Sequence, residues 1–271
     1  MAITGDMTTI SLEGLDESIE EVFHASAQAD NSLLTSVKTK IALGEGSHAF
    51  RVKEKLKMKK RTAPGQKVTH TPIAYGKVKV EFDRAYLSVP VDFQFGKEVD
   101  ADLVQDAVDS VSTAMYETSC ETLIGALEAS TSTAIPGVIT AAVIRKGMAQ
   151  LRKLGLGTNA EIHGVISADT LEILLGELTA TSRDYVEAAN IVDYGIGKWC
   201  GIIWHQVPDE QMTDPKKVFI YDKNSVGLVY GMNESKTTYD ANETSDIVQG
   251  FLTIGAKIIK EAGVVVLKGA A

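Results

Sequence analysis

Apolar and polar positions alternate over two stretches near the middle of the N-terminal half of the chain. From residue 50 to 61 the alternation has the period of a strand with one covered face, and its apolar positions are Phe50, Val52, Leu56 and Met58. A turn composition follows at 62–66, and a return strand is predicted over 77–82. The parity of the apolar positions then switches near Asp83 and Arg84, which predicts a bulge or a sharp bend.

A change to helical spacing after residue 100 predicts a long helix over about 101–128. Asp100 stands at the N-cap position, and Asp102 and Asp106 lie in the first turns, where the helix dipole favours anions. One face carries apolar residues at helical spacing: Val104, Val108, Val111 and Met115. Such a helix is about 40 Å long at ~1.5 Å per residue, a length typical of a structural backbone.

The remaining patterns describe an arm, an α/β unit and a closing tail. The arm contains a short amphipathic helix around residues 15–23 and a stretch at 33–43 that we expect to be extended. The α/β unit is predicted from helices at 139–154 and 169–178 and from strands at 162–166, 202–204, 217–221 and 226–230. In the tail, 247–259 and 264–267 are predicted strands, and we expect both to return to the sheet beside the long helix.

Charge is distributed unevenly along the 271 residues. Between Arg51 and Lys79 there are ten Lys or Arg against a single acid, Glu54. The net charge of the whole chain is −9, so the rest of it carries −18. A basic stretch on an acidic body can bind a polyanion or an acidic surface on another copy of the same chain. Composition alone leaves both alternatives open.

The sequence contains no recognisable site for catalysis, a cofactor or a metal ion. Phosphate-loop, dinucleotide, zinc and nucleophile-elbow motifs are absent, and the five histidines are scattered over separate elements. Cys120 and Cys200 are far apart in the sequence, and we expect both to be reduced thiols. The N-terminus lacks a signal peptide pattern, and no apolar run approaches the ~18–20 residues that cross a bilayer. Proteins that bind single-stranded nucleic acid interleave aromatic residues with basic ones. No aromatic residue lies between Arg51 and His70, which argues against such a site in this segment.

The order of these elements resembles the tailed-phage major capsid proteins of the Hong Kong 97-type fold. In that family an N-terminal arm leads into a long β-hairpin, the E-loop. A peripheral P-domain with a spine helix follows, then a central A-domain, and the chain returns to the P-domain sheet. The matching segments here are the E-loop at 46–90, the spine helix at 100–128, a strand-then-helix step at 163–171, a glycine-then-strand segment at 197–203 and closing strands at 246–267.

The resemblance implies an α+β fold with four parts. These are an N-terminal arm at 1–46, the E-loop hairpin at 47–92, a P-domain from 93–136 and 236–271, and an α/β A-domain at 137–235. Some members of the family cross-link an E-loop lysine to a P-domain asparagine, but no motif identifies such a pair here. A long N-terminal scaffolding region is also missing, which suggests a separate scaffolding protein or a processed form.

The function implied is self-assembly without catalysis or a cofactor. Pentamers and hexamers would form an icosahedral shell around double-stranded phage DNA, which is contacted without sequence specificity. The resemblance also implies scaffolding and portal partners, no membrane, a place in the virion capsid and assembly in the bacterial host cytoplasm. Inter-subunit contacts are expected from the E-loop residues Arg51, Lys53, Lys55, Leu56, Lys57, Met58, Lys59, Lys60, Arg61 and Lys67.

Two other functions remain open at this stage. An encapsulin-type bacterial compartment shares the fold but carries an enzyme cargo, and an interior pocket for a cargo peptide would favour it. A small-molecule enzyme on the α/β unit would need a convergent set of titratable residues.

Overall fold

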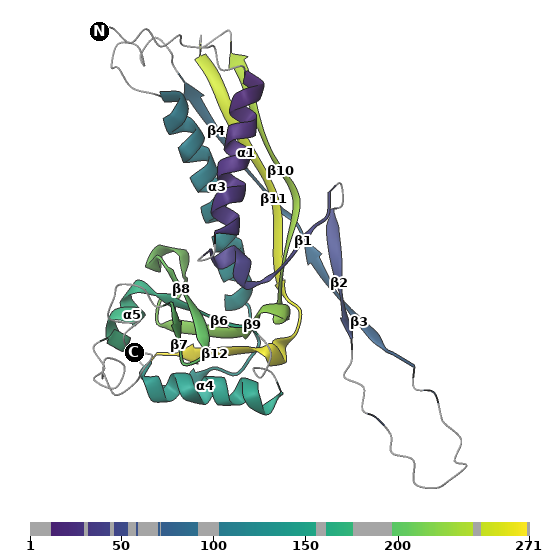
Figure 1. Cartoon of the computed structure of the whole chain (residues 1–271), viewed down its shortest axis with the longest axis vertical. Coiled ribbons are helices and arrows are strands. Elements are labelled where there is room, and N and C mark those ends of the chain that lie inside the picture. The colour runs from purple at the N-terminus through teal and green to yellow at the C-terminus, as the bar shows by residue number, and fades with distance from the viewer. Residues whose placement is uncertain are drawn as a thin grey trace.

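The chain contains three β-sheets with helices packed on two of them (Figure 1). A computed structural model describes residues 12–29, 32–43, 46–53, 58, 70, 72–91, 103–155, 161–175, 197–240 and 245–269. Within these ranges the sheets have four, six and two strands. No helix in the described ranges is long and apolar enough to span a membrane.

A four-stranded sheet with long strands is covered by two helices (Figure 1). Its strand order is β1 (Lys38–Ile41), β10 (Val226–Asp240), β11 (Ser245–Ile258) and β4 (Asp83–Val91). β1 runs parallel to β10, and the other two pairs are antiparallel. Helix α3 (Leu103–Glu128) packs against β11 and β4, while α1 (Leu12–Gln28) packs against α3 and β10. The long helix predicted over 101–128 is confirmed from Leu103 onward.

Helix α3 approaches β11 closely at a glycine. A Cβ at Gly250 would lie 2.6 Å from Cγ1 of Val111 and 3.2 Å from Sδ of Met115, so only glycine admits the helix this near. Polar side chains on α3 donate hydrogen bonds to carbonyls four residues earlier; they are Ser110, Ser112, Thr118, Ser119 and Thr122. For Ser112 and Ser119, which are buried, these bonds satisfy hydroxyls that would otherwise be unpaired in the core.

A six-stranded sheet forms the centre of the α/β unit. Its order is β5 (Ile135–Pro136), β12 (Val264–Lys268), β9 (Lys217–Asp222), β6 (Ile162–Ser167), β8 (Ile202–Val207) and β7 (Lys198–Trp199). Helix α4 (Ala141–Lys153) covers one face, and α5 (Ala168–Leu175) follows directly after β6. Thr140 caps α4, and Gly155 follows it with a φ of 76°, which confirms the predicted helix stop.

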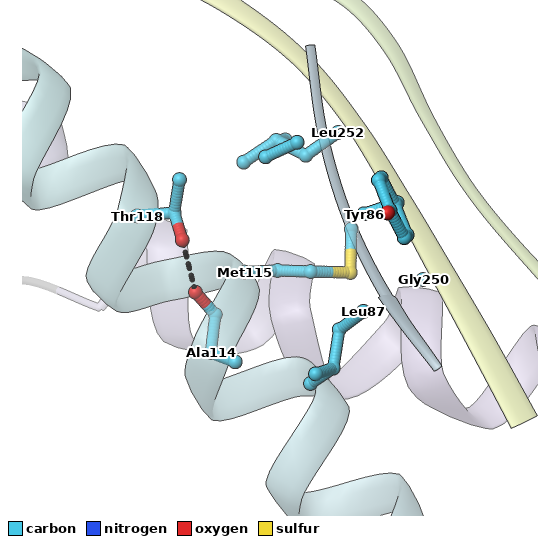
Figure 2. A pocket seen from close by; sticks show the side chains of 8 residues that line it. Tyr86, Leu87, Ala114, Met115, Thr118, Gly250 and Leu252 are labelled. Atoms are coloured by element: carbon cyan, nitrogen blue, oxygen red, sulfur yellow. Dashed lines mark hydrogen bonds between the residues drawn. The ribbon is translucent and has the colours of Figure 1, made fainter. Parts of the chain in front are cut away.

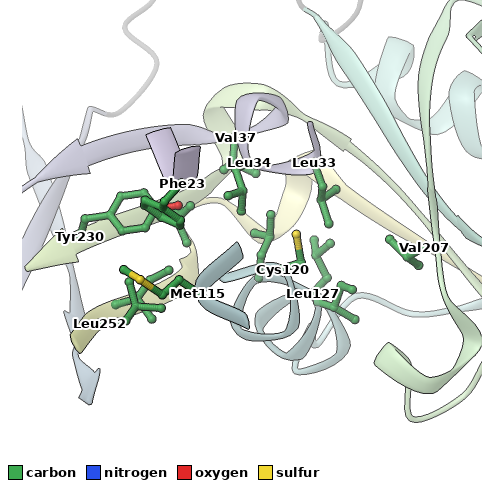
Figure 3. Close-up of a cluster of buried hydrophobic side chains, with 14 of the residues drawn as sticks. Phe23, Leu33, Leu34, Val37, Met115, Cys120, Leu127, Val207, Tyr230 and Leu252 are labelled. Atoms are coloured by element: carbon green, nitrogen blue, oxygen red, sulfur yellow. The ribbon is translucent and has the colours of Figure 1, made fainter. Parts of the chain in front are cut away.

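One apolar core runs from the four-stranded sheet through α3 to the six-stranded sheet. Tyr230 and Leu252 from the first sheet, Cys120 and Leu127 from α3, and Val207 from the second sheet belong to the same buried cluster (Figure 3). The six-stranded sheet is therefore packed between α3 on one face and α4 on the other. Because the two units share this core, they are expected to behave as one body.

Two polar contacts reinforce that junction. The carboxylate of Glu128, at the C-terminal end of α3, accepts hydrogen bonds from the backbone N of Thr213 at 2.8 Å and from its Oγ1 at 2.6 Å. A negative charge at the C-terminal end of a helix interacts unfavourably with the helix dipole, and the two hydrogen bonds offset this unfavourable energy. Tyr221 of β9, which is fully buried, shares a hydrogen bond of 2.5 Å with Ser36 of the short 3-10 helix η1 (Leu33–Ser36).

The structure corrects two sequence-based expectations. Residues 33–36 form η1 instead of an extended stretch, because Ser32 caps a single helical turn through a hydrogen bond from Leu34 N, and only β1 is extended. The expectation that both closing strands return to the sheet beside α3 holds for β11 and is wrong for β12. The turn η4 (Glu261–Gly263) separates β12 from β11, and β12 pairs with β9 and β5.

Burial explains the place of β12. Val264 and Val266 belong to the cluster on the α3 side, while Val265 and Leu267 belong to the cluster on the α4 side. A continuous apolar run suits a strand covered on both faces, which the six-stranded sheet offers and the four-stranded sheet does not. The assignment of the predicted strand at 226–230 to the α/β unit is also wrong, because it begins β10 of the four-stranded sheet; the predicted domain boundary at residue 235 therefore falls within β10, whose pairing with β11 continues to Asp240.

Candidate inter-subunit interface

A β-hairpin projects from the body of the molecule (Figure 1). Strands β2 (Ser47–Lys53) and β3 (Tyr75–Glu81) form an antiparallel two-stranded sheet, and among the described residues they pair with no other strand. Phe82 separates β3 from β4, which then enters the four-stranded sheet. This interruption at Phe82, where the chain passes from the hairpin to the four-stranded sheet, lies at the position where the parity switch near Asp83 predicts a bulge or a bend.

The bend rests on two glycines of the four-stranded sheet. A Cβ at Gly255 of β11 would lie 2.3 Å from the carbonyl oxygen of Glu81 and 3.1 Å from Cδ1 of Phe82. A Cβ at Gly231 of β10 would lie 3.2 Å from the same ring, where the register of β10 and β11 shifts between Tyr230 and Met232. Side chains at either position would displace the chain where the hairpin leaves the sheet.

The apolar face of the hairpin is anchored at its root by the same subunit. Phe50 and Val80 are buried, and they form a small core with Ala42, Val229 and Ile259. The ammonium of Lys38 lies 5.8 Å from the centre of the Phe50 ring, within reach of a cation–π interaction. At Phe50 the apolar face of the hairpin is thus covered by its own subunit.

The opposite face of the hairpin is basic. Arg51 and Lys77 stand directly across from each other in the strand register, and both are exposed. Like charges in this position weaken an isolated hairpin, so the face favours an anionic partner. Lys79 instead forms an exposed salt bridge of 3.3 Å with Glu81.

The predicted contact residues are only partly within the described ranges. Arg51, Met58 and the backbone of Lys53 are described, and Met58 is 99% exposed. The others lie outside the described residues: Lys55, Leu56, Lys57, Lys59, Lys60, Arg61 and Lys67. Their contacts therefore stay predictions.

The same subunit also has an acidic surface, which is complementary in charge to the basic face of the hairpin. Helices α1 and α3 contain no Lys or Arg. On α3 the exposed acids are Asp106, Asp109, Glu117 and Glu121. Glu117 and Glu121 are one turn apart on one face of the helix. This acidic surface could receive the basic face of a neighbouring copy.

Sequence reasoning missed an exposed aromatic residue beside α3. Tyr86 of β4 is 81% exposed and borders a shallow hollow between α3 and strands β4 and β11 (Figure 2). The lining residues are Ala85, Tyr86, Leu87, Ala114, Met115, Thr118, Gly250 and Leu252. No charged side chain lines the hollow, so it offers apolar contact and no acid–base chemistry. The available signal was an aromatic residue at a position of β4 where the alternation predicts an exposed, polar side chain.

Two histidines that are far apart in sequence form a buried pair in the six-stranded sheet. Nδ1 of His163 on β6 and Nε2 of His205 on β8 lie 3.1 Å apart, and their rings stack. His163 also stacks on Tyr221. Burial, the neighbouring His205 and Lys223 lower the pKa of His163 to about 4, while Glu161 opposes the shift. The imidazole is therefore neutral near pH 7 and packs as part of the core.

Acid is expected to destabilise the folded subunit through this pair. Between pH 6.5 and about 4 the unfolded chain binds a proton at His163 that the folded chain does not. The free energy of unfolding should therefore fall as the pH falls through this window, by about 3 kcal/mol. Thermal denaturation of the unassembled subunit across this range should show a flatter pH dependence for His163→Gln. The exposed control His24→Gln should behave like the wild type; an undiminished slope in His163→Gln would exclude the pair as the source.

Comparison with known proteins matches this architecture to phage capsids. A sequence profile of the phage capsid protein family matches residues 16–270. The capsid of Ralstonia phage GP4 superposes with a TM-score of 0.69 at 11% identity, covering 87% of this chain and 88% of that chain. The structure of Mycobacterium phage Che8 gives 0.65 at 17% identity, covering 82% and 84%. A virus-like particle from Pyrococcus furiosus gives 0.63 at 11% identity, covering 95% and 99%. Among curated proteins, none matches the chain in sequence.

The long helix on a long-stranded sheet, the α/β unit and the projecting hairpin define a subunit of the Hong Kong 97-type fold. The chain belongs to the phage capsid protein family, because the family profile covers nearly its whole length. It is a major capsid protein, a structural protein of the virion capsid, and the sequence-based identification of a phage capsid subunit with this fold is confirmed.

Proposed function

We propose that copies of this chain assemble through pentamers and hexamers into a closed icosahedral shell around the double-stranded DNA of a tailed phage. The observation that carries the proposal is the projecting hairpin, which holds Arg51 opposite Lys77 on an exposed face. Two like charges held opposite each other are stabilised by an anionic surface on another molecule. The shell would be assembled in the bacterial host cytoplasm.

The hairpin would lay its basic face on the acidic α1 and α3 helices of a neighbouring copy. Met58, almost fully exposed on one subunit, would add apolar contact beyond the root that Phe50 anchors. Contacts from the remaining predicted E-loop residues between Lys53 and Lys67 would extend the same interface. Obligate interfaces of this kind bury on the order of 2,000–5,000 Å², and many of them per shell combine multiplicatively.

The proposed parts of the subunit follow the predicted division, with the sheets as a guide. Residues 1–46 would act as an arm and 47–92 as the E-loop. The P-domain would be formed by residues 93–134 with β10 and β11, and the A-domain by residues 135–225 with β12, because β10 pairs in the four-stranded sheet while β5 and β12 pair in the six-stranded sheet. Scaffolding and portal proteins would be partners, and DNA would be contacted without sequence specificity. Neither a cofactor nor a membrane has a role in this proposal, and no catalytic step is assigned.

A compartment shell of the encapsulin type is the second candidate. The observation that favours it is the fold similarity to the virus-like particle from Pyrococcus furiosus, which extends over 95% of this chain. Such a shell would bind a peptide of an enzyme cargo on its inner surface. Particles that co-purify with one enzyme in a fixed ratio would support this candidate, whereas particles that require phage scaffolding and portal proteins would support the first.

Electron microscopy of the purified protein tests the proposal directly. We expect capsomers or large closed particles at physiological salt, with light scattering reporting the same species in solution. The proposal predicts that raising the salt concentration slows assembly, because the hairpin contact is electrostatic. A stable monomer at high protein concentration, with and without a scaffolding protein, would contradict it.

A further inference from the structure

Helix α4 presents a face of a single charge sign in an otherwise acidic chain. The helix contains four basic residues and no acid. Its solvent-exposed positions include Arg145, Lys146, Arg152 and Lys153. Within the described part of the chain, Lys146, Arg152 and Lys153 form no salt bridge. This cationic face is separate in sequence and in space from the projecting hairpin (Figure 1).

The orientation of the cationic face is fixed by packing on the six-stranded sheet. Ile144, Met148 and Leu151 are buried against it. A Cβ at Gly147 would lie 3.2 Å from Cδ2 of Leu267 and 3.3 Å from Cδ1 of Ile220, so the glycine lets the helix sit close to the sheet. The helix is therefore held with its basic side chains pointing away from the core.

The spacing of the basic residues produces two parallel rows. Arg145 and Arg152 are seven residues apart, as are Lys146 and Lys153, which is about two helical turns or ~10 Å. Cations in the last turn interact favourably with the helix dipole, and this interaction alone would account for Arg152 and Lys153. It does not account for Arg145 and Lys146 in the middle of the helix. Repetition of the pair two turns apart fits a partner with regularly repeating negative charge.

We propose that the cationic face of α4 binds the phosphate backbone of double-stranded DNA and marks the surface that faces the packaged genome. This inference rests on the proposed shell function, and it assigns a surface to a partner that the shell must enclose. Lys and Arg neutralise phosphates without reading the base sequence. No aromatic side chain is exposed on the helix for stacking on single-stranded bases, so the duplex backbone is the favoured form.

A second copy of the chain fits this face less well than DNA does. The cores of protein interfaces are enriched in aromatic, Met and Arg side chains and depleted of Lys and Ala, so on this face only the two arginines favour a protein partner. The exposed side of α4 consists of Ala142, Arg145, Lys146, Ala149, Gln150, Arg152 and Lys153. It contains two lysines, two alanines and no aromatic or Met residue. The hairpin, in contrast, combines basic side chains with an exposed Met58 and suits a protein partner.

The test compares two triple variants of the full-length subunit that lose the same charge. One carries Lys146→Gln, Arg152→Gln and Lys153→Gln on α4. The control carries Lys40→Gln, Lys257→Gln and Lys260→Gln, at three exposed positions outside α4. Fluorescence anisotropy with a random-sequence 30-base-pair duplex (about three helical turns) would measure binding between about 50 and 200 mM salt. Electron microscopy would measure assembly of the same preparations.

The α4 variant is expected to bind the duplex roughly tenfold or more weakly than the wild type. The slope of log affinity against log salt should drop by about 2 to 3 units, at ~0.9 for each phosphate that the variant no longer neutralises. The control should keep the wild-type slope, since its lysines lie elsewhere. Both variants should still form particles. In the wild type, bound DNA should also protect Lys146 and Lys153 from acetylation.

Each other outcome overturns the inference in a distinguishable way. An α4 variant that forms particles and keeps the wild-type slope excludes a DNA role for the face and leaves the shell function intact. An α4 variant that keeps the slope but loses assembly assigns the face to a contact between copies. If the wild type never forms particles, the proposed function fails, and with it the assignment of the α4 face to a packaged genome; a reduced salt slope in the α4 variant would then still show that α4 binds the duplex.

Discussion

Deletion of residues 53–79 is expected to leave a folded, soluble subunit that no longer closes into shells. Phe50 and Val80 remain in this variant, so the small core at the hairpin root stays covered. The four-stranded and six-stranded sheets use no strand from the deleted segment. The projecting basic and apolar side chains are removed, and with them the proposed interface to a neighbour. Electron microscopy would measure closed particles, and thermal denaturation would verify that the subunit is folded.

A charge-swap pair separates the role of the hairpin interface from any damage to the fold. Arg51→Glu with Lys77→Glu keeps the hairpin length, and we expect it to prevent assembly at low salt. Adding Glu117→Lys and Glu121→Lys should restore assembly if α3 is the acidic receptor. Restoration by this second pair would be hard to explain by a change in stability alone.

Two outcomes would contradict these predictions. Normal shells from the deletion variant would remove the E-loop assignment, and failure of the charge swap to restore assembly would place the acidic receptor elsewhere.

Substitution of Gly255 by alanine is expected to cause a large loss of stability at the bend. The new Cβ would lie 2.3 Å from the carbonyl oxygen of Glu81, a backbone atom that cannot rotate away. The chain between β3 and β4 must then shift, and overpacking of this kind costs about 3 kcal/mol. Urea denaturation of the unassembled subunit measures the change in the free energy of unfolding. The direction of the hairpin should change as well, so assembly should fail even at temperatures where the subunit stays folded.

Gly125→Ala is the matched control for that substitution. Gly125 lies in α3, and a Cβ there meets nothing within 4 Å. Alanine has the higher helix propensity, so this variant should gain about 0.5–1 kcal/mol in the free energy of unfolding. A Gly255→Ala subunit as stable as the wild type would mean that the bend does not depend on close approach at this glycine.

Most of the elements could be predicted from the sequence because their signals are local. The long helix α3 follows from apolar residues at helical spacing, and Val111 and Met115 lie on the buried face as predicted. The bend between β3 and β4 follows from a parity switch that is visible within a few residues of Asp83. The basic stretch, and the absence of aromatics between Arg51 and His70, are matters of composition. These features need no knowledge of what packs against them.

The candidate interface was only partly predictable from the sequence. Alternation indicated one apolar and one basic face, and the register bears this out with Arg51 opposite Lys77. It did not indicate that Phe50 is covered by Val229 and Ile259 of its own subunit, because those residues are about 180 and 210 positions away in the chain. The basic face of α4 was visible as a charge pattern, but its outward orientation depends on the sheet beneath.

Apart from the turn η1, the sequence by itself determined which segments are helical or extended, and which side of each is apolar, because those properties depend on neighbouring residues and on the periods of 3.6 and 2. Only the tertiary structure decided which strands pair. β12 joins β9 because both faces of its apolar run must be covered, and His163 meets His205 because β6 and β8 are adjacent. Such pairings are set by the free energy of burying surfaces that are far apart in sequence, which no local pattern contains.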